Sequence, residues 1–251
     1  MKVNPWSGKL ALITGASSGI GAATARLLAQ RGLQLLLTAR RVDRLQSLAD
    51  EIRADGGEAE VLVADLEQPA ERERLTAEVM QAFGCPDVLV NNAGMGWYGY
   101  YADMPPELAH RLLELNVTAV MDLTRQFLPA MRQRRSGAII NISSIAGSIP
   151  SQGIAMYAGT KAFLNAFTTA LHREMRRTGV TISVLQPGPV VTEFFDQAAS
   201  QKNGRRVPAE RLAIPAERVA GAVWSLLRRP RRQAFVPWFT RLTPWISLLF
   251  A

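Results

Sequence analysis

Short apolar runs, bounded by turn signals, recur along the chain at wide intervals. They cover residues 10–13, 33–38, 59–63, 88–90, 138–142 and 180–185. Each run is continuous rather than alternating with polar residues, which is typical of strands that are buried on both faces. The pattern therefore predicts six strands in a sheet that is covered on both sides.

Between these runs, the apolar residues follow the period of an α-helix. In residues 41–54, for example, Leu45, Leu48 and Ile52 share one stripe. The same reasoning predicts helices over residues 22–31, 71–83, 108–131 and 156–178. This alternation predicts an α/β fold, a doubly wound, Rossmann-type parallel sheet with helices on both faces. Because no linker or charge block divides the chain, we expect one domain over residues 1–251.

A glycine-rich turn, T-G-A-S-S-G-I-G at residues 14–21, directly follows the first predicted strand. Gly15, Gly19 and Gly21 permit a tight turn and a close approach of the backbone to a ligand. The turn opens a predicted helix, whose free N–H groups and dipole attract a pyrophosphate. The turn therefore predicts a site for the phosphate groups of a nucleotide.

Four further stretches accompany this turn in order along the chain. They are Asn91-Asn92-Ala93-Gly94 after the fourth predicted strand, Asn116 in the next helix, Ser144 thirteen residues before Tyr157-x-x-x-Lys161, and Pro187-Gly188-x-x-x-Thr192 after the sixth strand. Over about residues 8–195, these motifs resemble those of the short-chain dehydrogenase/reductase superfamily. The resemblance implies an oxidoreductase that uses a nicotinamide dinucleotide.

Tyr157 and Lys161 are four residues apart in a predicted helix, so they share a face. A phenol has a pKa near ~10, and we expect the Lys161 ammonium, together with nicotinamide charge, to lower it. Tyr157 then serves as a general acid in carbonyl reduction or a base in alcohol oxidation, and Ser144 hydrogen-bonds the substrate oxygen. The resemblance implies that Asn116 holds a water that links Lys161 to solvent. The predicted catalytic residues are Asn116, Ser144, Tyr157 and Lys161.

The second predicted strand ends in Ala39-Arg40-Arg41, without the acid that binds the ribose 2′-hydroxyl of NAD. A guanidinium matches the geometry of a phosphate, and two cations at a helix start oppose the helix dipole. We therefore expect NADP(H), with Arg40 as the main ligand of the 2′-phosphate and Arg41 sharing the load. The family's NADP-preferring members similarly carry a basic residue at the position of Arg40.

The resemblance also assigns the rest of the cofactor site. It implies that Asp65 and Leu66 border the adenine, and that Val190 and Thr192 hold the carboxamide of the nicotinamide. The predicted cofactor-binding residues are Gly15, Ser17, Ser18, Gly19, Ile20, Gly21, Arg40, Arg41, Asp65, Leu66, Asn92, Ala93, Gly94, Tyr157, Lys161, Val190 and Thr192.

Residues 193–215 match the family's mobile lid over the substrate and contain Phe194 and Phe195. We expect Trp97, Tyr98 and Tyr100 to wall the pocket, which favours an apolar, bulky carbonyl compound. A second interpretation, in which these aromatic side chains pack against the lid or a partner subunit, stays open.

The net charge of +8 is concentrated in residues 181–251, where ten Lys or Arg stand against four Asp or Glu. Residues 234–251 then form an apolar tail directly after the arginines of 228–232, and its prolines and Arg241 argue against a spanning helix. The tail either packs on protein, which we favour, or docks on an anionic membrane surface.

The composition excludes several other classes. A single cysteine, Cys85, cannot form an internal disulfide, and with only two histidines no metal site is expected. The chain lacks the patterns that accompany nucleic-acid binding, and residues 1–9 lack the apolar core of a signal peptide. We expect a cytoplasmic homodimer or homotetramer.

The function predicted from these residues is NADP(H)-dependent hydride transfer between nicotinamide and the carbonyl or secondary alcohol of an apolar substrate. Two alternatives stay open. One is a 3-oxoacyl thioester reductase, whose acidic carrier protein the basic C-terminal region could attract. The other is a protein that binds or senses a dinucleotide without turnover, although both Tyr157 and Lys161 are present.

Overall fold

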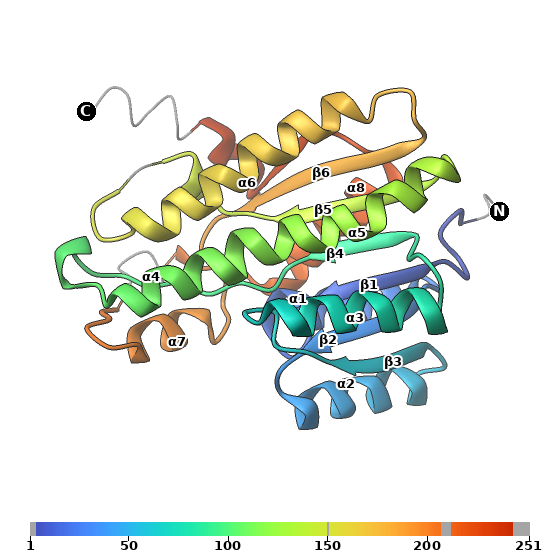
Figure 1. Cartoon of the computed structure of the whole chain (residues 1–251), viewed down its shortest axis with the longest axis horizontal. Helices are drawn as coiled ribbons and strands as arrows, with labels where there is room; N and C mark the ends of the chain where they lie inside the picture. The colour runs from blue at the N-terminus through green and yellow to red at the C-terminus, as the bar shows by residue number, and fades with distance from the viewer. Residues whose placement is uncertain (1–3, 150, 207–211, 243–251) are drawn as a thin grey trace.

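The computed structural model describes residues 4–149, 151–206 and 212–242. A parallel sheet with the strand order β3-β2-β1-β4-β5-β6-β7 forms the centre of the molecule (Figure 1). Its strands are β1 (Leu10–Thr14), β2 (Gln34–Ala39), β3 (Glu58–Val63), β4 (Val88–Asn91), β5 (Gly137–Ile142), β6 (Val180–Pro187) and β7 (Gln233–Val236). The six predicted strands and the doubly wound fold are confirmed.

Two layers of helices cover the sheet. The helices are α1 (Gly19–Gln30), α2 (Val42–Ala54), α3 (Pro69–Ala82), α4 (Pro106–Leu113), α5 (Ala119–Gln133), α6 (Ala155–Glu174), α7 (Phe194–Ser200) and α8 (Ala216–Arg228). Helices α1, α2 and α8 pack on one face, and α3, α5 and α6 pack on the other (Figure 1).

The strand β1 shows why the apolar runs are continuous. Ala11 and Ile13 belong to the core beneath α1, α2 and α8, whereas Leu12 belongs to the core beneath α3 and α5. Because side chains alternate between the faces of a strand, a sheet with a core on each side requires apolar residues at successive positions.

The strand order reverses between β1 and β4, which are neighbours in the sheet. The chain first builds outward from β1 to β2 and β3, and then returns to add β4 to β7 on the other side. In such sheets a crevice forms outside the carboxyl ends of the two strands where the order reverses. The glycine-rich turn after β1 and the Asn92–Gly94 turn after β4 both lie at this point.

The C-terminal part of the chain differs from the sequence prediction. Residues 216–228 form α8, and Ala234 to Val236 of the expected tail belong to the edge strand β7, which is parallel to β6. A strand of four residues is too short for its periodicity to stand out from an apolar tail. The remainder of the tail, residues 243–251, lies outside the described residues.

The helix predicted over residues 108–131 is divided in three. Helices α4 and α5 flank a π-helical segment, Glu114–Thr118, which contains Asn116. Within the described residues, none of the helices is both long enough and apolar enough to cross a lipid bilayer.

Candidate active site

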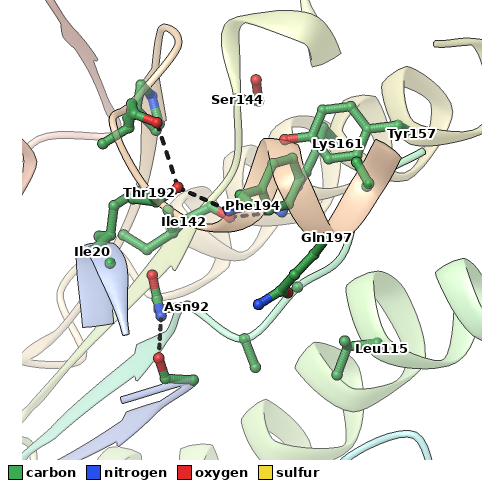
Figure 2. A pocket seen from close by; sticks show the side chains of 18 of the residues that line it. Ile20, Asn92, Leu115, Ile142, Ser144, Tyr157, Lys161, Thr192, Phe194 and Gln197 are labelled. Atoms are coloured by element: carbon green, nitrogen blue, oxygen red, sulfur yellow. Dashed lines mark hydrogen bonds between the residues drawn. The ribbon is translucent and has the colours of Figure 1, made fainter. Parts of the chain in front are cut away.

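A pocket of about 460 Å³ opens at the carboxyl ends of the central strands. Nearly all the predicted site residues line it: Gly15, Ser17, Ser18, Gly19, Ile20, Arg40, Arg41, Asp65, Leu66, Asn92, Ala93, Gly94, Ser144, Tyr157, Lys161, Val190 and Thr192. Gly21 and Asn116 are the two predicted residues that do not line it. In Figure 2, Ser144, Tyr157 and Lys161 lie together at one end of the pocket, while Ile20 and Asn92 lie at the other.

The turn between β1 and α1 packs too tightly for a side chain at Gly15 or Gly21. A Cβ on Gly21 would come 2.3 Å from the carbonyl oxygen of Gly15, and Gly15 itself has a φ of +65°. Gly21 therefore acts behind the pocket by keeping the turn compact, which explains why it does not line the wall. Ser18, which precedes the helix, makes no side-chain cap, and the first turn of α1 carries no acid. The helix therefore presents its N-terminal amides to an anion.

The turn after β4 is fastened to the end of β1. The side-chain amide of Asn92 donates to the carbonyl oxygen of Thr14 at 2.9 Å, and the backbone amides of Asn92 and Ala93 both donate to the hydroxyl of Thr14. These bonds hold the two turns of the crevice at a fixed separation. The turns form one wall of the pocket.

Tyr157 and Lys161 project from the first turns of α6, as their spacing predicts. The Nζ atom of Lys161 lies 5.8 Å from the centroid of the Tyr157 ring and donates to the carbonyl oxygen of Ile142 at 3.1 Å. Ser144 follows β5, and its hydroxyl accepts a hydrogen bond from the amide of Ala146 at 3.1 Å. Its neighbour Ser143 is buried and donates instead to the carbonyl oxygen of Lys161.

Desolvation dominates the acid–base properties of this cluster. Burial lowers the pKa of Lys161 to about 8 and raises the pKa of Tyr157 to about 12, with an opposing contribution from the Ser144 side chain. A phenol with this pKa is protonated at neutral pH and can donate its proton. The prediction that Lys161 and the nicotinamide charge together lower the pKa of Tyr157 concerns the complex with the dinucleotide, and it stays a prediction.

Asn116 is buried in the π-helical segment, and its side chain forms hydrogen bonds with neighbouring parts of the chain. Its Nδ2 donates to the carbonyl oxygen of Met95 at 2.9 Å and to the hydroxyl of Thr160 at 3.1 Å, while its Oδ1 accepts from the amide of Met95. A Cβ on Gly94 would lie 3.1 Å from Asn116 Oδ1 and 3.5 Å from Lys161 Nζ, so both polar atoms flank Gly94. The role predicted for Asn116 through a water stays a prediction.

The two arginines after β2 point to different partners. Arg40 donates to Glu67 at 2.9 Å, and Arg111 of α4 donates to the same carboxylate at 2.6 Å. Arg41 instead lies over the glycine-rich turn, where its Nη2 donates to the hydroxyls of Ser18 at 2.6 Å and Ser17 at 3.0 Å. Arg41 is therefore the arginine that contacts the side chains of the predicted phosphate turn.

Helix α7, which follows β6, forms part of the pocket wall. Phe194, Phe195 and Gln197 of α7 line the pocket, and the Phe194 ring lies 5.6 Å from that of Tyr157 (Figure 2). Part of the expected lid, residues 207–211, lies outside the described residues.

Only one of the three expected wall aromatics is found in the pocket. Trp97 is 4% exposed and lines the pocket, as predicted. Tyr98 packs against Gly153, and the half-exposed Tyr100 accepts a hydrogen bond from Gln152 at 3.2 Å. The prediction is therefore corrected for Tyr98 and Tyr100, because their contacts are with Gly153 and Gln152, which do not line the pocket.

Several residues at the rim were not singled out from the sequence. Glu67 pairs with both Arg40 and Arg111, and Glu193 pairs with both Arg41 and Arg44. The two residues of each of these pairs are between 27 and 152 positions apart along the chain. Such distant pairing leaves no local signal in a single sequence.

The arrangement fits a dinucleotide. The close-packed glycines, the uncapped start of α1 and the guanidinium of Arg41 present hydrogen-bond donors and positive charge for phosphate groups. At the far end, a protonated phenol and a buried lysine lie beside a hydroxyl. This arrangement can donate a proton to a substrate oxygen while stabilising the charge that develops there.

Comparisons with known proteins agree with this geometry. The model of the short chain dehydrogenase family matches residues 9–203. The 3-oxoacyl-[acyl-carrier-protein] reductase FabG of Escherichia coli is 35% identical over 221 residues, which cover 87% of this chain and 89% of that protein.

Two solved structures are also similar. A short-chain dehydrogenase from Sphingobium yanoikuyae in complex with NADPH has a TM-score of 0.85 and 32% identity, covering 96% of this chain and 92% of that chain. A short-chain dehydrogenase/reductase from Burkholderia phymatum in complex with NAD has a TM-score of 0.85 and 25% identity, covering 97% and 92%. The first of these structures holds NADPH and the second holds NAD.

Proposed function

Because the chain belongs to the short-chain dehydrogenase/reductase superfamily and is an oxidoreductase of carbonyl and alcohol groups, we propose that it is an NADP(H)-dependent reductase of apolar ketones. One observation carries this proposal: Ser144, Tyr157 and Lys161 line the same pocket. Tyr157, whose raised pKa keeps the phenol protonated at neutral pH, supplies the proton that carbonyl reduction requires.

Tyr157, Ser144 and Lys161 have separate roles in the proposed reaction. When bound, the nicotinamide ring supplies the hydride in reduction and accepts it in oxidation. Tyr157 donates its proton to the substrate oxygen, and Ser144 hydrogen-bonds that oxygen as negative charge develops on it. The Lys161 ammonium lies 5.8 Å from the Tyr157 ring and stabilises the phenolate that remains.

The preference for NADP(H) rests on Arg41 and Arg40. Arg41 lies on the hydroxyls of Ser17 and Ser18, so its guanidinium is already held against the phosphate-binding turn. Neither arginine is accompanied by the acid that binds the 2′-hydroxyl of NAD, since Ala39 ends β2. The NADPH in the Sphingobium yanoikuyae structure supports this choice, while the NAD in the Burkholderia phymatum structure makes it a proposal that needs its own test.

The apolar substrate class rests on the pocket wall. Trp97, Phe194 and Phe195 face the cavity together with Ile149 and Ile154. Apart from Lys161, the charged residues in the described lining are Arg40, Arg41 and Asp65, and all three belong to the predicted cofactor site. An apolar cavity with one hydrogen-bonding cluster suits a ketone that has hydrophobic groups on both sides of its carbonyl.

A panel of ketones tests the proposal. Purified protein is mixed with NADPH or NADH, and oxidation of the reduced nicotinamide is followed by its absorbance. We expect turnover of aryl and long-chain alkyl ketones with NADPH at a kcat/KM at least about ten-fold above that with NADH. Turnover of polyhydroxylated ketones alone, or equal use of both cofactors, contradicts the proposal.

A second candidate function, reduction of 3-oxoacyl thioesters, is favoured by the similarity to the FabG reductase of Escherichia coli. The cluster Arg228, Arg229, Arg231 and Arg232 is exposed and offers a surface to an acidic carrier. Comparison of acetoacetyl groups on acyl-carrier protein and on a short thiol distinguishes the two. A large, salt-sensitive preference for the carrier-bound form supports the second candidate.

The expected oligomer and cytoplasmic location stay predictions. Met121 of α5 and Phe163 of α6 are exposed on the surface, and Phe163 stacks on Phe167 at 5.5 Å. These apolar side chains support an interface between subunits on this face. Light scattering coupled to gel filtration gives the mass in solution, and a monomer contradicts the expectation.

A further inference from the structure

Glu193, at the start of α7, makes a contact that the hydride transfer itself does not use. Its carboxylate accepts a hydrogen bond from Arg41 Nη1 at 2.7 Å and pairs with Arg44 as well. The two guanidiniums hold the pKa of Glu193 down at about 2, so the carboxylate is charged at any neutral pH. An acid from the far side of the pocket is thus paired with the arginine that lies on the phosphate-binding turn.

Arg41 has its donors distributed between two elements. Its Nε and Nη2 atoms donate to Ser17 and Ser18, and its Nη1 atom donates to Glu193. The pairs with Glu193 join residues that are 152 and 149 positions apart in the chain. The contact therefore links the adenosine end of the predicted cofactor site to the segment that closes the pocket.

The residues on either side of Glu193 reach the other end of the pocket. Thr192 lines the pocket, and its hydroxyl accepts a hydrogen bond from the amide of Phe194 at 3.3 Å. Phe194 packs on the ring of Tyr157 and fills the space against Gly96, where an added Cβ would lie 2.5 Å from the ring. Glu193 therefore contacts the arginine that lies on the phosphate-binding turn. Its neighbour Phe194 contacts the phenol of the proton donor (Figure 2).

A phosphate and a carboxylate are alternative partners for the same guanidinium. A phosphate monoester carries about −1.5 to −2 charges near pH 7 and three acceptor oxygens, so it outcompetes a single carboxylate. If both anions stayed beside Arg41, they would repel each other within a few ångströms. NADH has a hydroxyl in place of this phosphate and leaves the carboxylate in place.

We propose that Glu193 competes with the 2′-phosphate of NADPH for Arg41 and Arg44, and thereby couples the identity of the bound dinucleotide to the position of α7. This inference rests on the proposed preference for NADP(H). NADPH displaces Glu193 and loosens the start of α7, whereas NADH leaves α7 fastened. Glu193 is thus a specificity-determining residue that weakens the binding of NADPH and makes the lid responsive to it.

Two fragments of the cofactor, 2′,5′-ADP and 5′-AMP, isolate the 2′-phosphate, since neither carries the nicotinamide. Calorimetry measures their affinities for the wild type, Glu193→Gln and the matched control Asp196→Asn. Asp196 is an exposed acid of the same helix, and among the described residues no ion pair involves it. We expect Glu193→Gln to bind 2′,5′-ADP about 2- to 10-fold more tightly, the range for loss of one or two exposed ion pairs. Binding of 5′-AMP stays unchanged, and Asp196→Asn resembles the wild type.

The outcomes separate the two proposals. If the wild type shows no preference for 2′,5′-ADP over 5′-AMP, the proposed preference for NADP(H) fails, and this inference fails with it. If the wild type does prefer 2′,5′-ADP but Glu193→Gln binds it no more tightly than Asp196→Asn does, only the competition by Glu193 is wrong.

Hydrogen exchange tests the coupling to α7. Amides of residues 194–200 are expected to exchange faster in the wild-type complex with 2′,5′-ADP than in the complex with 5′-AMP. In Glu193→Gln both complexes exchange at the faster rate. Equal exchange in the two wild-type complexes overturns the coupling, even where the affinities behave as expected.

Discussion

The ring of Phe194 lies 5.6 Å from the ring of Tyr157, at an interplanar angle of 54°. Phe194 belongs to the first turn of α7, so the segment that covers the pocket touches the proposed proton donor directly. The contact excludes water from one side of the phenol and contributes to the burial that raises the Tyr157 pKa to about 12. One side chain thus limits the room for substrate and shields the acid that the reaction uses.

Phe194→Ala tests this relationship. The change removes a ring from the pocket wall, so we expect kcat/KM for bulky aryl ketones to rise about ten-fold, while small ketones lose the contact and react more slowly. Phe83→Ala, at the exposed end of α3, serves as the matched control. Steady-state kinetics on ketones of increasing size measure the effect, and an unchanged size preference contradicts the position given to Phe194.

Tyr157→Phe tests the proton donor. The ring is retained and only the hydroxyl is lost, so turnover is expected to fall by about 10²–10⁴ while NADPH affinity changes little. Rates are measured under saturating cofactor, and affinity is measured by quenching of tryptophan fluorescence. Equal activity of variant and wild type on any accepted ketone contradicts the role of Tyr157 as the proton donor.

The structure favours Arg41 over Arg40 as the main ligand of the 2′-phosphate. Arg40 is paired with Glu67, whereas Arg41 lies on Ser17 and Ser18, so Arg41→Ala is expected to lose more affinity for NADPH. Loss of one charge-assisted contact corresponds to about 1.5–3 kcal/mol, or roughly 10- to 150-fold in Kd. Affinity for NADH should change by less than a few-fold. If Arg40→Ala has the larger effect, the sequence-based assignment is the correct one.

Much of the fold was predictable because its signals are local. The continuous run at residues 10–13 and the glycines that follow it lie within a short stretch, and together they specify a buried strand and a phosphate turn. β7 was not predicted, because four residues at a sheet edge carry too little pattern. The π-helical turn around Asn116 was not predicted either, since nothing in the spacing of its neighbours departs from an ordinary helix.

The site was predictable where spacing along one element decides the geometry. Tyr157 and Lys161 share a face of α6, and the interval from Ser144 brings that residue to the same pocket. The ion pairs at the rim of the pocket could not be predicted from the sequence, because the pairing of Glu193 with Arg41 joins residues 152 positions apart. The burial that raises the pKa of Tyr157 was not predicted for a related reason, because burial is a property of the whole fold.

The lowered pKa of Lys161 predicts a pH dependence of both activity and stability. Above pH 8 the lysine loses its charge, so carbonyl reduction should slow between pH 8 and 10 although Tyr157 remains protonated. For stability, the unfolded lysine binds a proton up to its ordinary value of 10.5, whereas the folded one releases it near 8. Unfolding therefore takes up a proton between these values, and the free energy of unfolding rises with pH.

Comparison with Lys161→Met isolates this contribution from other groups that titrate. Relative to the variant, the wild type is expected to gain about 3 kcal/mol between pH 8 and 10.5. Urea denaturation at a series of pH values measures the difference. A wild type that loses stability relative to Lys161→Met over this interval contradicts the direction of the shift.

The C-terminal segment gives a last prediction. Deletion of residues 234–251 removes three of the four residues of β7, exposes the edge of β6 and takes away the buried Val236. We expect a loss of about 2 kcal/mol or more and a fall in Tm of roughly 4–8 °C. Deletion of residues 243–251 leaves β7 complete and is the matched control, with a smaller expected change in Tm. If instead the longer deletion leaves Tm unchanged, and the intact protein sediments with anionic vesicles more weakly at high salt, the segment serves a membrane surface rather than the sheet.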